Sequence, residues 1–136
     1  MNICIFGESC VGKSTLAKAL QERIGATVYT GKDYLRLAKN EAEATEKFRS
    51  LLAEEDNIIY VTTEPHELSL LPDNCLRILL TEELTVIKER FSKRMHGHLP
   101  PPVEAMLEKK HGIFDAVPHD LHFHGGNIDI DQILNR

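Results

Sequence analysis

The sequence predicts an α/β fold in which helices cover both faces of a parallel sheet of about five strands. Short, continuous apolar runs alternate along the chain with longer segments whose apolar residues recur every three or four positions. Continuous runs are typical of strands buried on both faces of a parallel sheet, and the longer period is typical of the helices that cover it. The chain has 136 residues, of which 42% are hydrophobic and 27% charged. We therefore expect residues 1–136 to form a single domain with one core.

The first half of the chain is predicted to hold three strands. Each is a short run of apolar or β-branched residues, and it is bounded by a glycine, a proline or a charged segment. Between them, apolar residues at three- and four-residue steps predict helices, and Gly25 is a stop signal for the first of these. The expected elements are a strand at Ile3–Phe6, a loop at Gly7–Gly12, a helix from Lys13 to Ile24, a strand at Thr27–Thr30, a helix opening at Tyr34–Ala38, a charged helix with the apolar stripe Ala44, Phe48, Leu51 and Leu52, and a strand at Ile58–Val61.

The second half repeats the alternation with a proline-rich interruption. Its long helix has apolar residues on one face and several basic residues on another. Three consecutive prolines then predict a break, because proline lacks a backbone N–H and clashes inside a helix. The expected elements are a strand at Leu76–Leu80, a helix at Thr81–Met95, a breaker at Gly97–Pro102, a helix at Val103–Lys110, a strand at Leu121–Phe123, a turn at Gly125–Gly126 and a closing helix at Asp129–Leu134.

Charge, hydropathy and cysteine content exclude several classes of function. The net charge of −5 argues against stable nucleic-acid binding, which needs broad neutralisation of phosphates. No apolar run is long enough to cross a bilayer, and we interpret Met1–Phe6 as the start of the sheet and not as a signal peptide. The three cysteines are odd in number and lack metal-ligand spacing. Free thiols suit a reducing compartment, so we expect a cytoplasmic protein.

One motif identifies the candidate site. Gly7-Glu8-Ser9-Cys10-Val11-Gly12-Lys13-Ser14 fits the phosphate-loop pattern G-x-x-x-x-G-K-[ST] without a mismatch, between a predicted strand and a predicted helix. The two outer glycines allow close approach of the backbone, so the loop amides can surround phosphates at the positive end of the helix. The motif predicts a site for a nucleoside triphosphate and Mg²⁺ and hence the three-layer α/β/α fold of P-loop proteins.

Three side chains at the end of the motif have predicted roles. Lys13 is expected to reach the outer phosphates and to take part in catalysis, and the Ser14 hydroxyl to ligate Mg²⁺. Thr15 is expected to contact the inner phosphate. Cys10 occupies a variable position among inward-facing amides, where a thiol could be acidified.

Other segments resemble the small-molecule kinases among P-loop proteins. Thr30-Gly31-Lys32-Asp33-Tyr34-Leu35-Arg36 resembles the Thr-Gly-Asp-x-x-Arg stretch of adenylate kinases with one residue inserted, and Glu46-Lys47-Phe48-Arg49 resembles the Phe-Arg of shikimate kinases. Arg77-Ile78-Leu79-Leu80-Thr81 and a helix with Arg90 and Arg94 resemble the fourth strand and the arginine-bearing approach to the lid. The tail from His119 to Asp131 resembles the last strand and closing helix. The resemblance covers most of the chain and is to nucleoside monophosphate (adenylate or cytidylate) kinases, with shikimate and gluconate kinases as cousins.

The chain departs from that family on the acceptor side. Thr62-Thr63-Glu64-Pro65 stands where adenylate kinases have Gly-Phe-Pro-Arg. The resemblance implies a reduced acceptor-binding region at about residues 32–56 and a short lid at about residues 90–102. It implies an ATP-dependent phosphotransferase, most simply a kinase of a nucleoside monophosphate. A kinase of a shikimate- or gluconate-like metabolite is the alternative, and a nucleotide-binding regulatory module with little turnover is an alternative of another class. Oligomeric state and the choice between ATP and GTP stay open.

Charged residues outside the motif divide between the donor and the acceptor. Arg90 and Arg94 lie one helical turn apart, and the resemblance implies that they stabilise charge on the transferred phosphoryl group; otherwise they belong to a solvated basic face. Asp33 is expected either to orient Mg²⁺ or accept a proton, or to cap a helix. Glu64 is expected to bind the acceptor, and it is the candidate for the metal role if Asp33 is only a helix cap. Arg36 and Arg49 could bind an anionic acceptor or simply be surface residues.

Histidines near the C-terminus form the remaining cluster. His122 and His124 alternate on a predicted strand and share a face, with His119 nearby. A metal site is conceivable there. Exposed histidines at a sheet edge are the favoured interpretation, because no cysteine or convincing fourth ligand is near.

Overall fold

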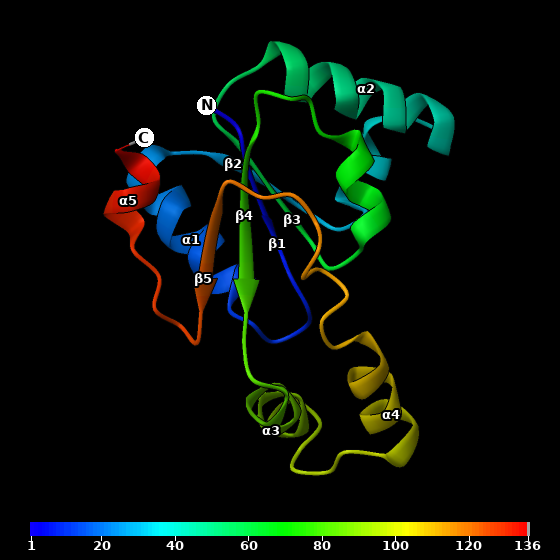
Figure 1. Ribbon diagram of the computed structural model, residues 1–136. Coiled ribbons are helices and arrows are strands. Elements are labelled where there is room, and N and C mark those ends of the chain that lie inside the picture. The colour runs from blue at the N-terminus through cyan, green and yellow to red at the C-terminus, as the bar shows by residue number, and fades with distance from the viewer. Residues whose placement is uncertain (136) are drawn as a thin grey trace.

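The computed structural model describes residues 1–135, and these contain the five-stranded parallel sheet that the sequence predicts. The strand order is β2-β3-β1-β4-β5, so β1 lies at the centre and every neighbouring pair is parallel (Figure 1). The strands are β1 (Ile3–Phe6), β2 (Thr27–Thr30), β3 (Ile58–Thr62), β4 (Leu76–Thr81) and β5 (Leu121–His124). Because all five run the same way, their carboxyl ends meet at one edge of the sheet.

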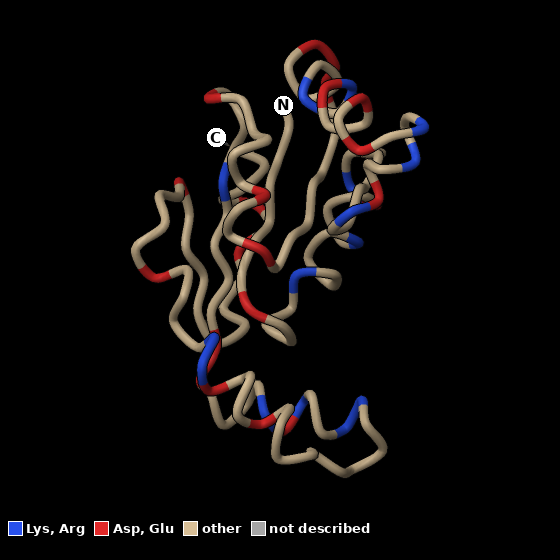
Figure 2. Tube along the Cα trace, turned by 90° about the vertical axis from the view of Figure 1, so that its right-hand side faces the viewer, with Lys and Arg blue, Asp and Glu red and all other residues tan. Residues whose placement is uncertain are grey.

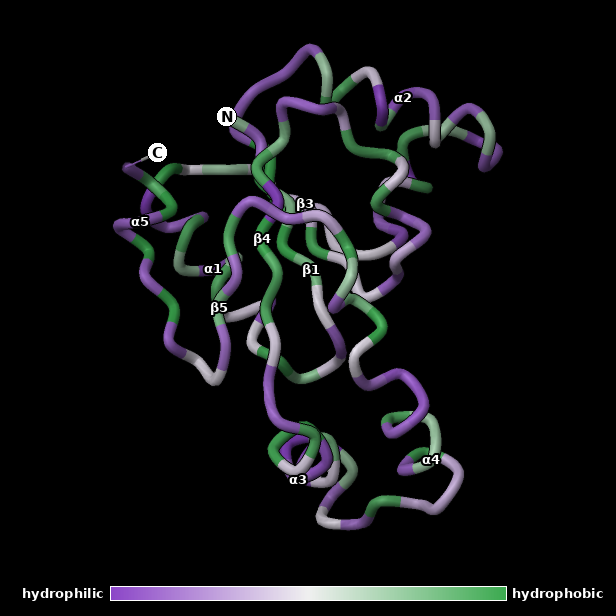
Figure 3. The backbone as a smooth tube through the Cα atoms, viewed as in Figure 1, coloured by the Kyte–Doolittle hydropathy of each residue, from purple (hydrophilic) through white to green (hydrophobic). Residues whose placement is uncertain are grey.

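Helical layers cover the two faces of the sheet. The helices are α1 (Lys13–Ile24), α2 (Glu41–Glu54), α3 (Leu84–Arg94), α4 (Pro101–Lys110) and α5 (Ile130–Leu134), with 3₁₀ turns η1 (Asp33–Leu37) and η2 (Pro65–Leu70). One apolar cluster joins α1 and α5 to side chains such as Ile5 and Ile78. The other joins η1, α2 and η2 to side chains such as Phe6 and Tyr60. Figure 3 shows the hydrophobic strands between these layers. The three-layer α/β/α prediction is therefore confirmed.

The α3–α4 hairpin projects beyond the carboxyl ends of the strands (Figure 1). Its two helices pack through Ile87 and Leu107, both buried. An ion pair between Lys88 and Glu108, with the nitrogen and oxygen 2.6 Å apart, joins them at the surface. Figure 2 shows basic and acidic residues interspersed along the hairpin. The hairpin is thus a small packed unit beside the edge where the phosphate loop lies.

The boundaries of three elements differ from the sequence prediction. Thr81 belongs to β4 and not to the following helix, since it continues the ladder opposite His124. The segment after β2 forms a separate 3₁₀ turn before α2. Pro101 and Pro102 begin α4 instead of excluding helix. The first turn of a helix has no internal partner for its N–H groups, so proline is favourable there. Among the described residues, no helix has the length and hydrophobicity to span a membrane.

Candidate nucleotide-binding site

The phosphate loop connects β1 to α1, and its geometry requires glycine at both ends. A Cβ at Gly7 would lie 2.3 Å from the carbonyl oxygen of Leu80, which is far inside van der Waals contact. Gly12 has a φ of 101°, a conformation that side chains rarely allow. Cys10 also has a positive φ, 66°, which turns the backbone at the middle of the loop. The motif therefore adopts a tightly curved loop at the N-terminus of a twelve-residue helix.

A cavity of about 200 Å³ opens over this loop. Its lining comes from the phosphate loop and the start of α1, from the carboxyl ends of β2 and β3, and from the end of α3. The residues that line it are Ser9, Cys10, Gly12, Lys13, Ser14, Thr15, Thr30, Gly31, Val61, Thr62, Thr63 and Arg94. Of the nine loop residues predicted from the motif, Gly7, Glu8 and Val11 do not line it, and all three are buried.

Lys13 lies at the centre of this lining and is 7% exposed. Its ammonium group donates a hydrogen bond to the backbone carbonyl of Glu8. The pKa of Lys13 is lowered from its ordinary 10.5 to about 8, mainly by burial and to a smaller extent by the nearby positive charge of Arg94. Anionic phosphates would offset both effects, because they stabilise the protonated form.

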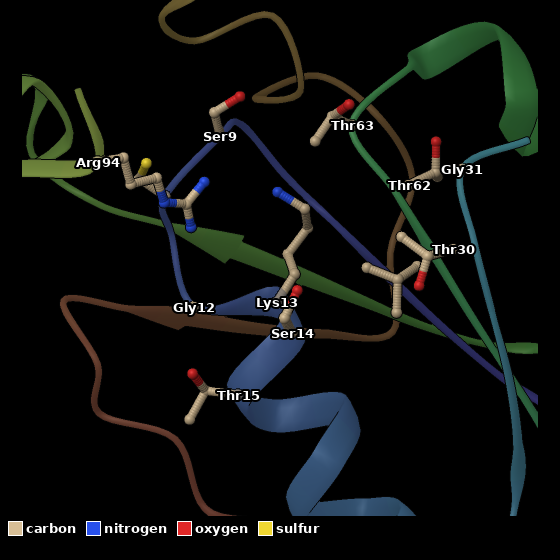
Figure 4. Close-up of a pocket in the computed structure, with 12 residues that line it drawn as sticks. Ser9, Gly12, Lys13, Ser14, Thr15, Thr30, Gly31, Thr62, Thr63 and Arg94 are labelled. Atoms are coloured by element: carbon tan, nitrogen blue, oxygen red, sulfur yellow. The ribbon is translucent and has the colours of Figure 1, made fainter. Parts of the chain in front are cut away.

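The structure separates the two arginines that the sequence places on one helix face. Arg94 lines the cavity, and Figure 4 shows its guanidinium extending toward the same space as the Lys13 ammonium. Arg90 does not line it. Its guanidinium donates to the carbonyl of Cys10 at 2.9 Å and lies 3.5 Å from the buried carboxylate of Glu82. Arg90 therefore holds the back of the phosphate loop.

A second contact joins the loop to the segment after α4. The Glu8 carboxylate, with 8% of the side chain exposed, accepts the Gly112 N–H at 3.1 Å and lies 3.0 Å from Nδ1 of His111. Both residues directly follow α4. The phosphate loop is thus attached to α3 through Arg90 and to the end of α4 through Glu8.

Asp33, predicted for catalysis and for Mg²⁺, lies outside the cavity lining, as do the three residues predicted to bind the acceptor, Arg36, Arg49 and Glu64. The Asp33 carboxylate accepts the backbone N–H of Thr30 at 3.0 Å and lies 3.8 Å from the exposed guanidinium of Arg36. Glu64 is partly exposed and lies 3.9 Å from His66. Arg49 is exposed on α2. Asp33 is nevertheless one contact from the cavity, because Thr30 lines it.

A buried carboxylate that the sequence analysis missed supports the cavity wall. Glu67, on η2, is 3% exposed, and its Oε1 accepts the hydroxyl proton of Thr62 at 2.7 Å. Its other oxygen, Oε2, is buried without a hydrogen-bond partner among residues 1–135. No sequence signal marked Glu67, because it lies five residues beyond the strand in a segment with no motif.

The histidines gather beside β4 and β5 in a separate cavity of about 370 Å³. The hydroxyl of Thr81 lies 2.7 Å from Nε2 of His122 and 2.8 Å from Nδ1 of His124. His119 stacks edge-on with His122, their ring centres 5.6 Å apart. In residues 1–135, no group of three or more His, Cys, Asp or Glu side chains has a metal-binding arrangement.

No known protein-family profile and no curated protein matches the sequence. Solved structures do resemble the fold. They include the YorR protein of Bacillus subtilis in complex with phosphorylated GDP, with 19% identity, a TM-score of 0.65, and coverage of 99% of this chain and 92% of that chain. The shikimate kinase of Acinetobacter baumannii in complex with shikimate has 14% identity, a TM-score of 0.66, and coverage of 98% and 93%. A gluconokinase of Sinorhizobium meliloti has 14% identity, a TM-score of 0.60, and coverage of 98% and 87%. At these identities the likeness shows the fold alone, and the chain shares that fold with a shikimate kinase and a gluconokinase.

Proposed function

We propose that this protein transfers a phosphoryl group from ATP to a small acceptor. The observation that carries the proposal is the composition of one cavity. Lys13 and Arg94 supply two cations from the phosphate loop and from α3, while Thr30, Gly31, Thr62 and Thr63 form an uncharged polar wall at the ends of β2 and β3. Cations on one side suit the triphosphate, and hydrogen-bonding groups on the other suit an acceptor.

In this reaction the acceptor hydroxyl oxygen forms a bond to the terminal phosphorus of ATP as the bond to the ADP oxygen breaks, and the hydroxyl proton is released to water. Phosphoryl transfer depends mainly on positioning and on neutralising charge. The amides of the loop and Lys13 would hold the outer phosphates, and Arg94 would stabilise charge on the transferred group. Ser14 lines the cavity and would hold Mg²⁺, which when bound neutralises charge between the phosphates. Asp33, whose partner Thr30 lines the cavity, is proposed to orient the ion or the acceptor from the rim.

The uncharged wall favours a hydroxylated metabolite as the acceptor. Arg36 and Arg49, the predicted contacts for an anionic acceptor, are exposed and do not line the cavity. Solved structures with this fold include a shikimate kinase and a gluconokinase. A nucleoside monophosphate is the second candidate. It is supported by the position of Arg36 beside Asp33 at the rim and by the fold shared with the YorR protein bound to phosphorylated GDP.

A turnover screen tests the proposal. ATP and Mg²⁺ are incubated with hydroxy acids, sugar acids and each nucleoside monophosphate, and ADP formation is followed. We expect one class to raise ADP formation at least a hundredfold over the acceptor-free rate, with the new phosphate ester visible by ³¹P NMR. Lys13→Ala should nearly abolish nucleotide binding and ADP formation, because the outer phosphates lose their cation. The chain should stay folded, because the substitution removes a buried charge. ADP formation that stays at a trace level with every acceptor would instead indicate a nucleotide-binding module.

A further inference from the structure

The strand beside the phosphate loop ends without a carboxylate in the cavity. β3 neighbours β1, and Thr62 at its end pairs with Phe6, the last residue of β1. None of the described residues that line the cavity is Asp or Glu. A divalent ion held through nucleotide phosphates normally keeps several waters, and those waters donate hydrogen bonds to nearby acceptors. An acceptor at the end of β3 must therefore come from a group other than a lining carboxylate.

The hydroxyl of Thr62 has hydrogen-bond partners that determine what it can offer. It donates its only proton to Oε1 of Glu67 at 2.7 Å, and it accepts the backbone N–H of Glu64 at 3.0 Å. A hydroxyl has one proton and two lone pairs. One lone pair is left, so the group can accept a further hydrogen bond but cannot donate one. Such a hydroxyl is matched to a donor such as a metal-bound water and is mismatched to a phosphate oxygen.

Glu67, the acceptor of the Thr62 hydroxyl proton, is a buried carboxylate with few hydrogen-bond partners of its own. It is 3% exposed within the apolar face that contains Cys4, Tyr34 and Tyr60, and burying a carboxylate there is costly. The Tyr60 hydroxyl lies near the Glu67 carboxylate, but it donates its proton to the carbonyl of Gly31 at 2.7 Å. Burial, and then the Glu67 carboxylate, raises the pKa of the Tyr60 phenol, so Tyr60 stays neutral and keeps that proton. One oxygen of Glu67 remains without a partner.

We propose that Glu67 is a positioning residue of the nucleotide–metal site, which directs the hydroxyl proton of Thr62 away from the cavity and leaves its oxygen to accept a hydrogen bond from a metal-bound water. This inference rests on the proposed nucleotide site but not on phosphoryl transfer. Thr62 lines the cavity together with Ser14, the residue proposed to bind the ion itself (Figure 4). The carboxylate thus acts on the ion through the threonine from the layer behind the sheet.

The test measures metal binding and not turnover. Binding of a non-hydrolysable ATP analogue is measured by calorimetry with Mg²⁺ and with a chelator, and Mn²⁺ affinity in the presence of the analogue by electron paramagnetic resonance. The variants are Glu67→Gln, Thr62→Val and the two together. Loss of a group that orients a metal site typically costs about 10- to 100-fold in metal affinity. We expect each single variant to lower Mn²⁺ affinity about tenfold and to change metal-free analogue binding less than about threefold.

Two features separate the positioning role from a structural one. The double variant should lose no more metal affinity than Thr62→Val alone, because Glu67 acts through that hydroxyl. Thr62→Ser keeps the hydroxyl and should keep the metal affinity, with thermal unfolding confirming that every variant is folded. The proposal would be overturned if the single variants lost analogue affinity equally with and without metal, or if their Mn²⁺ affinity did not change. It would also be overturned if the losses of metal affinity added up in the double variant. A parent protein that fails to bind the analogue would overturn the proposed function as well, whereas metal-enhanced binding retained in both single variants would overturn this inference only.

Discussion

Lys13 is buried and lies near the positive charge of Arg94, and these surroundings make nucleotide binding depend on pH. Its pKa is lowered to about 8, while an unfolded chain would keep the ordinary 10.5. Between these two values the unfolded chain binds more protons, so the stability of the free protein rises with pH in this window. Affinity for the ligand should instead fall as pH rises, because a triphosphate binds the protonated form of Lys13 and a deprotonated amine must take up a proton on binding.

We therefore predict that affinity for ATP and Mg²⁺ falls as pH rises above about 8, by at most about tenfold per pH unit. Calorimetry near pH 9, in buffers with different ionisation enthalpies, should show uptake of close to one proton per nucleotide bound. Phosphates are fully ionised there, so the proton belongs to the protein. The Lys13→Arg side chain stays charged at pH 9, so nucleotide binding to this variant should show no proton uptake. A parent protein with pH-independent affinity from pH 7 to 9.5 would contradict the lowered pKa.

Arg94 and Arg90 have different surroundings and should give different kinetic defects. Arg94 lines the cavity, whereas Arg90 is bound to the Cys10 carbonyl and to Glu82. Removing an arginine that acts on the transferred group costs on the order of a thousandfold in rate. We predict that Arg94→Ala loses about this much turnover with little change in ATP affinity. Arg90→Ala should mainly weaken ATP affinity, because the loop loses a support.

Steady-state kinetics and analogue titration distinguish these outcomes, with Lys93→Ala as the matched control. Lys93 lies beside Arg94 on α3 but is exposed and paired with Glu89. It should keep near-parental turnover and affinity. If Arg94→Ala behaves like that control, the end of α3 is only a solvated basic face, and the kinase proposal loses its support outside the phosphate loop.

At the scale of elements, the α3–α4 hairpin has the features of a lid. Its tip, from Met95 to Pro100, lies between two helices and contains His96 and Gly97 in the left-handed region of backbone conformation. Its two stems contact the phosphate loop through Arg90 and through Glu8 with His111. A segment attached at both stems can move at its tip while its base stays in place.

We predict that amide hydrogen exchange across about residues 90–102 slows when an ATP analogue and Mg²⁺ bind, by at least about tenfold at the tip, as expected for a lid that excludes water during transfer. Peptides from β1 and β3 should be well protected in both states and serve as internal controls. Glu8→Gln replaces the carboxylate that accepts the Gly112 N–H and contacts His111, and it should increase exchange around residues 107–113 without ligand. Equal exchange at the tip in both states would argue against a lid.

The whole molecule depends on a core whose residues are distinct from those of the site. Ile5, at the centre of β1, has no exposed surface and carries no polar atom toward the cavity. Truncation of such a side chain to alanine typically costs about 2–5 kcal/mol. We predict that Ile5→Ala lowers the melting temperature by roughly 10 °C and leaves nucleotide affinity in the folded protein within about threefold.

Differential scanning calorimetry with and without ATP and Mg²⁺ checks this separation of stability and binding. Ligand at a hundred times its dissociation constant should stabilise both proteins by about 2.7 kcal/mol. Lys13→Ala should show the reverse pattern, a melting temperature close to that of the parent but no stabilisation by ligand. A loss of affinity in Ile5→Ala as large as its loss of stability would show that core and site are not separable.

The amino-acid sequence by itself determined those features whose signals are local. Continuous apolar runs identified the strands, and the motif from Gly7 to Ser14 identified the loop and its flanking elements. These succeeded because side-chain period, glycine conformation and helix capping act over a few neighbouring residues. The same reasoning failed at Pro101, where a proline run that would break a helix interior instead begins a helix, since its position relative to the first turn decides the effect.

Only the tertiary structure decided which side chains share the cavity. Arg90 and Arg94 share a helix face, but one turn of rise, about 6 Å, places only Arg94 at the cavity and leaves Arg90 against the back of the loop. Asp33 follows a strand as expected, yet its carboxylate turns to the backbone of Thr30. Glu67 meets Thr62 because η2 folds back over the sheet. Contacts of this kind depend on the direction of side chains and on how layers pack, and neither is encoded in the spacing of residues along one segment.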